Sequence, residues 1–181
     1  MTLSLLLASC AGREHAPAAH AETAPVAVLH RAGDANGQSA AAAAQSRCGD
    51  AAACFAVGHA LSNGEPRDYL GTMAAYRSAC DQTGHGLPAH REDLLACVNL
   101  GILFEQGRGA PVDEAGAAAL YARACDAGEA ASGCGMLGAH DLRSAGSDSE
   151  RARARALLRR ACAAGNVEVC RMLDADEQRS R

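Results

Sequence analysis

The stretch from Cys97 to Cys125, CVNLGILFEQGRGAPVDEAGAAALYARAC, decides the fold of this chain. Its first half carries four residues at helical spacing, which places them on one face of a helix. These residues are Cys97, Leu100, Gly101 and Phe104. Gly107 and Gly109 follow, and glycine turns the chain at a helix end without the penalty of a Cβ atom. The first half therefore predicts one helix that ends in a glycine-rich turn.

The second half of the stretch predicts another helix, antiparallel to the first. Pro111 suits the first turn of a helix, where its missing N–H group costs nothing. Asp113 places negative charge at the positive end of that helix. The helix should run to Cys125, and Gly128 should end it. The whole stretch predicts a helical hairpin with a cysteine at each outer end.

The same hairpin pattern recurs along the chain at a nearly fixed period. The opening pattern C-x-x-(V/L)-G begins at Cys54, Cys97 and Cys134, and in degraded form at Cys170. Successive openings are 43, 37 and 36 residues apart. The closing pattern ends at Cys80, Cys125 and Cys162, and an acidic residue lies twelve positions before each of them. A period of this length predicts an array of stacked structural repeats.

The order A-x-x-L-G, then G-x-G-x-x-x-D, then Y-x-x-A resembles the Sel-1-like repeat, a helical-hairpin relative of the tetratricopeptide repeat. The pattern of a cysteine at each helix end resembles that of the Helicobacter cysteine-rich proteins, a branch of that family. The third unit departs from the pattern, with Leu158 in place of tyrosine and only Gly146 of the glycine pair. The resemblance implies an all-α fold, an α/α superhelix (solenoid) of hairpins, that binds partner proteins or peptides and has no single activity.

The repeat register divides the chain into three parts. The solenoid should begin with a half-unit helix that ends at Cys48 and should end with a single helix after Cys170. That last helix turns polar at Asp174 and Glu177, and terminal repeats need a polar outer face. The parts are a signal peptide at 1–10, a flexible tether at 11–38 and a solenoid at 39–178, which comprises a half-unit 39–53, units 54–81, 97–127 and 134–164, and a terminal helix 167–178. The tether is rich in Ala, Gly, Pro and His and lacks a period. Such a composition buries too little apolar surface to offset the entropy of ordering.

The first ten residues, MTLSLLLASC, have the character of an export signal. Leu7-Ala8-Ser9-Cys10 resembles the lipobox of bacterial lipoproteins, in which the cysteine is lipidated. The apolar run is too short to span a bilayer, which needs about 20 residues, and it lacks a basic n-region. The sequence therefore predicts lipidation of Cys10 and an outer-membrane or periplasmic location. An ordinary signal peptide and a chance Leu-rich start are the alternatives.

Nine cysteines predict a disulfide framework in an exported protein. With Cys10 used for lipid, eight remain, and two pairing schemes are geometrically sensible. Pairing within each hairpin gives 54–80, 97–125 and 134–162, and leaves Cys48 and Cys170 unpaired. Pairing between successive hairpins joins Cys48 to Cys54, Cys80 to Cys97, Cys125 to Cys134 and Cys162 to Cys170. The second scheme leaves no cysteine over and matches what the family resemblance implies, and we favour it.

The resemblance also implies where a partner binds. The first helix of each hairpin should line the concave face of the stack. Each of these helices buries its Cys/Leu/Gly face, so neighbouring positions should face the groove. The residues predicted to contact a partner are His59, Asn99, Ile102, Met136 and His140.

The sequence carries no recognisable catalytic motif. All 17 basic residues are arginine, so an S-x-x-K serine site cannot be built, and neither H-E-x-x-H nor G-x-S-x-G occurs. We therefore expect a non-catalytic binding scaffold without a cofactor. The alternative is the β-lactam-binding or β-lactamase-like activity that labels some cysteine-rich relatives.

Charge and composition exclude other kinds of ligand. The net charge is −4 and only five residues are aromatic, two Phe and three Tyr, so we expect no nucleic-acid binding. The arginines between 151 and 160 are interpreted as a solvated helix face.

His85 and His90 lie between Cys80 and Cys97, but a Cys/His metal site needs thiolates, and a disulfide explains these sulfurs better. We expect no metal, and a monomer.

Overall fold

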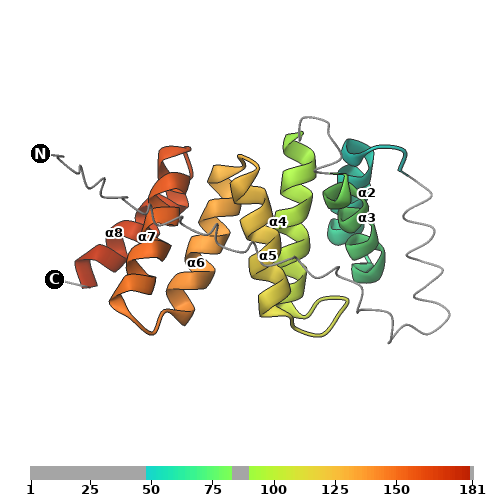
Figure 1. The fold of residues 1–181 in the computed structure, drawn as a ribbon. Helices are drawn as coiled ribbons and strands as arrows, with labels where there is room; N and C mark the ends of the chain where they lie inside the picture. Colours follow the sequence, from blue (N-terminus) through green and yellow to red (C-terminus); the bar gives the residue numbers. More distant parts are fainter. Residues whose placement is uncertain (1–47, 83–89, 180–181) are drawn as a thin grey trace, which may run out of the picture. The chain divides into compact units, whose positions relative to one another are not determined.

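The computed structural model describes residues 48–82 and 90–179, and within these ranges it contains seven α-helices, one short π-helix and no strand (Figure 1). The elements are α2 (Ala51–Asn63), α3 (Tyr69–Asp81), α4 (Arg91–Gln106), α5 (Glu114–Asp126), η1 (Ala130–Cys134), α6 (Gly135–Ser144), α7 (Asp148–Ala163) and α8 (Val167–Arg179). The predicted all-α fold is confirmed. Cys10, the tether and residues 39–47 of the predicted half-unit lie outside the described residues.

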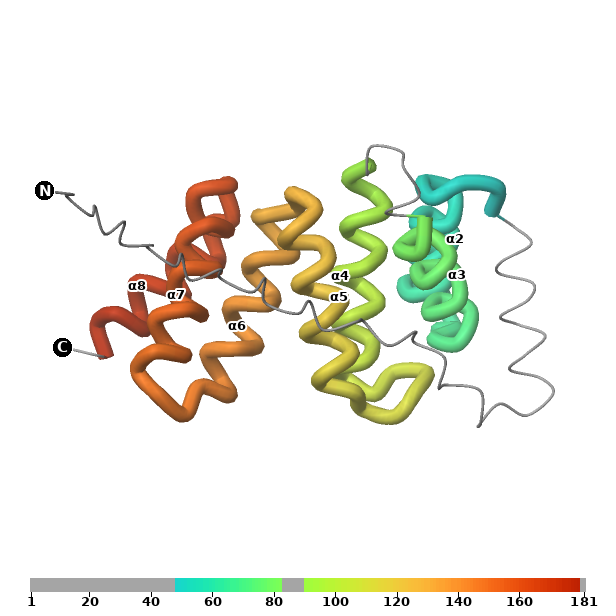
Figure 2. The backbone as a smooth tube through the Cα atoms, viewed as in Figure 1, coloured from blue at the N-terminus to red at the C-terminus, as the bar shows by residue number. Residues whose placement is uncertain are grey.

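The helices pack as hairpins in chain order (Figures 1 and 2). Helix α2 pairs with α3, α4 with α5, and η1 and α6 together with α7, while α8 packs on α7. The first helices of successive hairpins also touch, α2 with α4 and α4 with η1. Each hairpin therefore contacts mainly its neighbours, as expected of a repeat array.

Short polar side chains fix where the helices begin. The carboxylates of Asp68 and Asp113 each accept a backbone N–H at 2.8 Å, and so cap α3 and α5. Helix α5 begins at Glu114, so the expectation that Pro111 lies in its first turn is wrong. Asp50 caps α2, which therefore includes residues 51–53 of the predicted half-unit 39–53.

The recurring glycine of the opening pattern lets the two helices of a hairpin approach closely. A Cβ atom on Gly101 would lie 2.6 Å from a ring carbon of Tyr121, and one on Gly58 would lie 2.6 Å from the ring of Tyr76. Both tyrosines are almost fully buried. In the third hairpin Gly138 faces Leu158 instead, at 3.0 Å. The glycine and the aromatic residue thus form one packing unit, which explains why the sequence repeats them together.

The terminal helix α8 is attached by a small apolar contact and by ion pairs. Val169 and Leu173 are buried in a cluster with residues of α7. Arg155 donates to Asp176 at 2.6 Å, and a second arginine of α7, Arg159, pairs with Glu177, also at 2.6 Å. Two of the arginines predicted to form a solvated face are therefore partners of α8.

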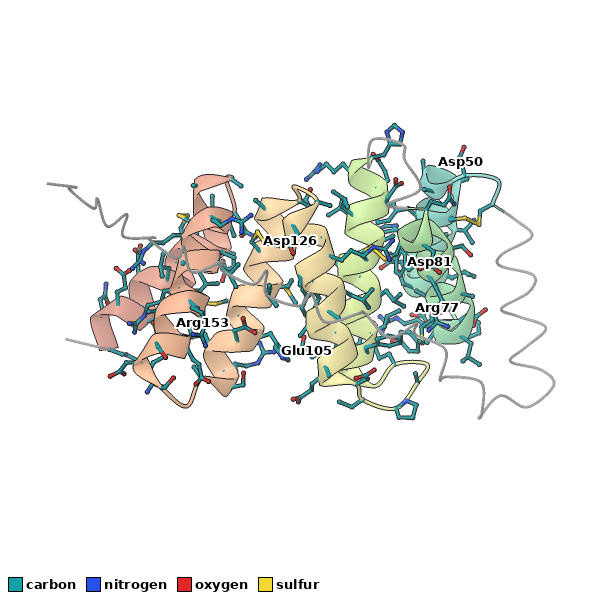
Figure 3. The ribbon with its side chains drawn as sticks, in the orientation of Figure 1. Asp50, Arg77, Asp81, Glu105, Asp126 and Arg153 are labelled. Carbon is teal, nitrogen blue, oxygen red and sulfur yellow. A yellow bond between two sulfur atoms is a disulfide. The ribbon has the colours of Figure 1, made fainter. Side chains whose placement is uncertain are left out.

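Four disulfides lie at the ends of the repeats (yellow bonds in Figure 3). Two of them join one hairpin to the next, one joins α7 to α8, and one joins Cys48 to α2. The pairs are Cys48–Cys54, Cys80–Cys97, Cys125–Cys134 and Cys162–Cys170, with Cα–Cα distances of 4.6–4.8 Å. These are the pairs of the second scheme. Disulfides persist in oxidising compartments, so this framework indicates an extracytoplasmic environment. None of the helices within 48–82 and 90–179 has the length and apolar character that crossing a bilayer requires.

Candidate functional site

An apolar groove of about 320 Å³ lies on the first helices of the second and third hairpins and on α8. Helix α4 contributes Leu95, Val98, Asn99 and Ile102 to its lining, α6 contributes Met136 and Ala139, and α8 contributes Val169 and Met172. Ser132, Asn166 and Glu168 supply polar atoms at its edge. Ligand-binding pockets have volumes of roughly 300–1,000 Å³, so this groove is at the small end of the range. A groove of this size suits one or two large apolar side chains of a partner.

The groove follows the register of the repeat. Its lining includes the residues two and five positions after each opening cysteine, namely Asn99 and Ile102 in α4 and Met136 and Ala139 in α6. In the third hairpin the residue one position after the cysteine is Gly135, where the first hairpin has Phe55. A Cβ atom on Gly135 would lie 3.1 Å from the Val169 side chain, so this glycine lets α8 pack close to α6 at the groove.

Three of the five residues predicted to contact a partner, Asn99, Ile102 and Met136, line this groove. His59 has the correct register but lies on α2, where its ring is exposed and stands 6.4 Å from the Phe55 ring. His140 lies six positions after Cys134, one residue out of register, and its side chain is only 13% exposed. The structure does not bring the two histidines to the groove.

Sequence reasoning missed the contribution of α8 to the groove. The sequence predicts a polar outer face for this terminal helix, yet Met172 is 37% exposed and lines the groove. Asn166 orients the start of the helix, since its Nδ2 donates to the carbonyl of Ala131 at 2.7 Å and its Oδ1 accepts from Val169 N at 3.1 Å. The signal was present in the sequence, because Met172 stands two positions after Cys170, as Asn99 and Met136 do after their cysteines.

A polar network closes the end of the α4–α6 junction. Glu105 of α4 accepts a hydrogen bond from the Tyr121 hydroxyl at 3.0 Å and forms an ion pair with Arg143 of α6. His140 Nδ1 lies 3.7 Å from the same carboxylate. Burial raises the pKa of Tyr121 to about 12, so its hydroxyl stays protonated and remains a donor at neutral pH.

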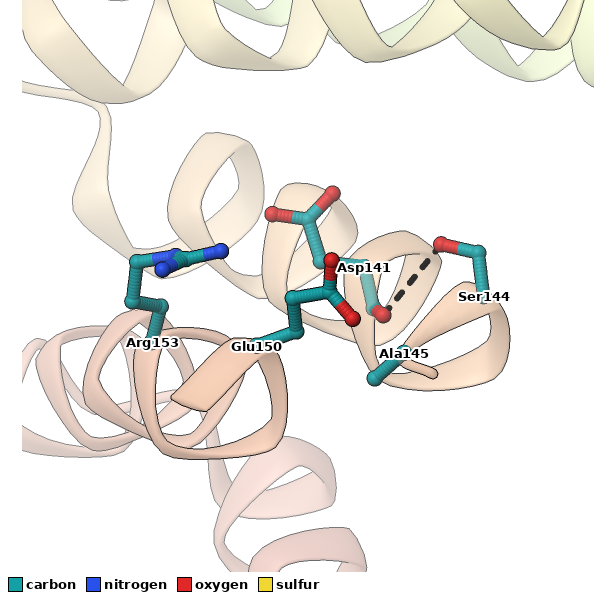
Figure 4. Close-up of a pocket in the computed structure, with 5 residues that line it drawn as sticks. All are labelled: Asp141, Ser144, Ala145, Glu150 and Arg153. Atoms are coloured by element: carbon teal, nitrogen blue, oxygen red, sulfur yellow. Dashed lines mark hydrogen bonds between the residues drawn. The ribbon is translucent and has the colours of Figure 1, made fainter. Parts of the chain in front are cut away.

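A second, polar pocket of about 250 Å³ lies at the turn of the third hairpin (Figure 4). Asp141, Ser144, Glu150 and Arg153 line it together with Ala145. Hydrogen bonds from the Ser147 side chain and from the backbone N–H groups of Gly146 and Ser147 lower the pKa of Glu150. Its carboxylate thus belongs to the capping box of α7. Among the described residues, no group of three or more His, Cys, Asp or Glu side chains is placed to hold a metal ion.

Comparison with solved structures identifies a protein of the same architecture. The crystal structure of a Sel1 repeat protein from Oxalobacter formigenes superimposes with a TM-score of 0.53 and 25% sequence identity, over 77% of this chain and 96% of that one. The chain is similar to a Sel1 repeat protein.

No family model and no curated protein matches the chain. The Sel1 repeat likeness therefore depends on the arrangement of the helices and on the repeated cysteine, glycine and tyrosine positions. Together with the four disulfides, the likeness supports a helical repeat scaffold, similar to a Sel1 repeat protein, in an extracytoplasmic environment.

Proposed function

We propose that this chain is an exported, lipid-anchored scaffold that binds a protein or peptide partner in the groove between α4, α6 and α8, without catalysis. The observation that carries the proposal is the groove itself, an apolar hollow built from matching positions of consecutive repeats. Apolar side chains of a partner would be removed from water there. Each Å² of apolar surface buried in this way would contribute about 25 cal/mol of favourable binding free energy. The thioethers of Met136 and Met172 can adapt to side chains of different shape.

Polar groups in the groove would orient the partner. Asn99 stands among apolar neighbours on the α4 wall, and its amide also interacts with the hydroxyl of Tyr76. Asn166 and Ser132 lie at the rim. A few polar groups within an apolar lining are typical of sites that fix the orientation of a ligand. Because Asn99 also supports Tyr76, a substitution there would disturb both binding and packing, so Met172 is the cleaner position to test.

Met172→Glu should weaken peptide binding at least tenfold, because it places a charge where an apolar side chain would be buried. The ligand is a peptide selected from a random phage-displayed library panned on the wild-type protein, and its affinity is measured by fluorescence anisotropy. Leu70→Glu is the matched control, since Leu70 is 38% exposed on α3 and Met172 is 37% exposed on α8. Unchanged affinity of Met172→Glu would place the binding surface elsewhere.

The anchor is tested separately from the groove. We propose that Cys10 carries the lipid and that residues 11–38 connect it to the repeats. Cys10→Ala should move the protein from the detergent phase to the aqueous phase in a partition experiment, because a lipidated cysteine is the only anchor the proposal invokes. The wild-type chain expressed without its first ten residues is the soluble reference. Equal partition of Cys10→Ala and the wild type would refute lipidation.

A further inference from the structure

The polar network at Glu105 joins the second hairpin to the third beside the groove. Figure 3 labels Glu105 close to the place where the α4–α5 hairpin meets α6. Its side chain is 19% exposed and contacts groups from two other helices, the Tyr121 hydroxyl of α5 and the Arg143 guanidinium of α6. Charge-assisted hydrogen bonds of this kind are stronger than neutral ones. The network therefore connects three helices through one carboxylate.

The network is not part of the repeat pattern. Glu105 lies eight positions after Cys97, and the matching residues of the first and third hairpins are Ser62 and Leu142. The glycine–tyrosine contact, by contrast, occurs in both of the first two hairpins. The hairpin fold thus does not require a carboxylate at this position, and the one hairpin that carries it forms a wall of the groove.

Other polar contacts hold the opposite end of the same junction. Arg91, the first residue of α4, lies 3.5 Å from the carboxylate of Glu129, whose side chain is 8% exposed. Glu129 caps η1, and the carbonyl of Ala131 in η1 accepts the hydrogen bond from Asn166. Between these contacts and Glu105 the facing walls of α4 and α6 are lined by apolar side chains and Asn99. Polar contacts therefore fix both ends of a junction whose middle is mainly apolar.

We propose that Glu105 and Arg143 are positioning residues, which hold α6 beside α4 and so set the width of the groove. Small residues, Gly135 and Ala139, line the α6 wall, and they offer little interlocking surface against sliding. A groove held at a fixed width binds without first ordering its walls, and this preorganisation increases affinity. The consequence for binding rests on the proposed function, whereas the effect on α6 does not.

The positioning role is tested first without any ligand, by hydrogen–deuterium exchange. Glu105→Gln removes the charge and keeps an acceptor for Tyr121, and Arg143→Gln removes the other member of the pair. Each variant should speed amide exchange within α6 about tenfold and leave α2 and α3 unchanged. The double variant should be no faster than either single variant, because both remove the same interaction. Unchanged exchange in α6 for both variants would overturn the proposal.

The second readout is affinity for the phage-selected peptide. Glu105→Gln and Arg143→Gln should each bind it about tenfold more weakly, although neither residue lines the groove. Exchanging the two charges, Glu105→Arg with Arg143→Glu, should restore most of the affinity. Asp148→Asn is the control, since it breaks an ion pair between the exposed Asp148 and Arg151 in the same hairpin. Faster exchange with unchanged affinity would show that the network stabilises α6 without positioning the groove, and would also overturn the proposal.

Discussion

Reduction of the four disulfides should unfold most of the helical array at physiological temperature. The bonds close loops with sequence separations of 6 to 17 residues, and the chain-entropy model assigns roughly 2–3 kcal/mol to each loop of this size. A small domain has a total stability of about 5–15 kcal/mol. The chain has no tryptophan and only five other aromatic residues. Packing of its apolar core therefore supplies little stability to replace that of the disulfides.

The measurement is thermal unfolding by circular dichroism with and without a phosphine reductant in the same buffer. The paired variant Cys125→Ser with Cys134→Ser should lower the stability by about 3 kcal/mol. These two sulfurs are fully buried between the second and third hairpins. The terminal pair Cys162→Ser with Cys170→Ser is the comparison, and it should mainly loosen α8. Coincident unfolding curves for the reduced and oxidised protein would contradict the prediction.

Gly101→Ala should destabilise the second hairpin by about 1–3 kcal/mol, as overpacking of a filled core does. The new Cβ would lie 2.6 Å from a ring carbon of Tyr121 and 3.2 Å from the Ala117 carbonyl oxygen. The ring cannot move away easily, because Tyr121 is fully buried and its hydroxyl is bonded to Glu105. This cost exceeds the gain of about 0.8–1 kcal/mol that alanine brings to a helix interior.

Urea unfolding of Gly101→Ala measures the effect, and Gly146→Ala is the control. A Cβ on Gly146 would lie 3.6 Å from its nearest neighbour, an oxygen of Glu150, which is an ordinary contact. The control should change the stability by less than about 1 kcal/mol. A Gly101→Ala protein as stable as the wild type would show that α4 and α5 can separate, and would refute the packing role of the glycine.

The sequence predicted the hairpins because its signals are local and repeated. Cys97, Gly101 and Tyr121 each have a fixed place in a helix, and their counterparts in the other units occupy the matching places, with Leu158 in place of tyrosine in the third. The same register placed Asn99, Ile102 and Met136 in the lining of one groove, and their role in binding a partner stays a prediction. His140 lies outside the groove lining for a simple geometric reason. One additional residue rotates a side chain by 100° around a helix, and this turns the imidazole from the groove toward Glu105.

The remaining features depend on contacts between units, which no single repeat encodes. The Glu105 network needs an acid in one hairpin and an arginine in the next, 38 residues apart. The role of Met172 needs α8 to lie against the third hairpin at a particular angle. The close approach of α8 to Gly135 depends on a glycine where the first hairpin has Phe55. The repeat register therefore predicts which positions line the groove, whereas the contacts between units depend on residues that the units do not share.

The disulfides also determine how the molecule would carry a mechanical load. When the chain is pulled at its ends, the Cys80–Cys97 disulfide transmits the tension directly from Cys80 to Cys97. The residues between the two cysteines would feel almost no tension, and the same holds inside the other three bridges. Between Cys54 and Cys162 the loaded path therefore consists of residues 54–80, 97–125 and 134–162. An insertion in the segment between Cys80 and Cys97 would therefore lengthen the polypeptide without making the stretched molecule more extensible.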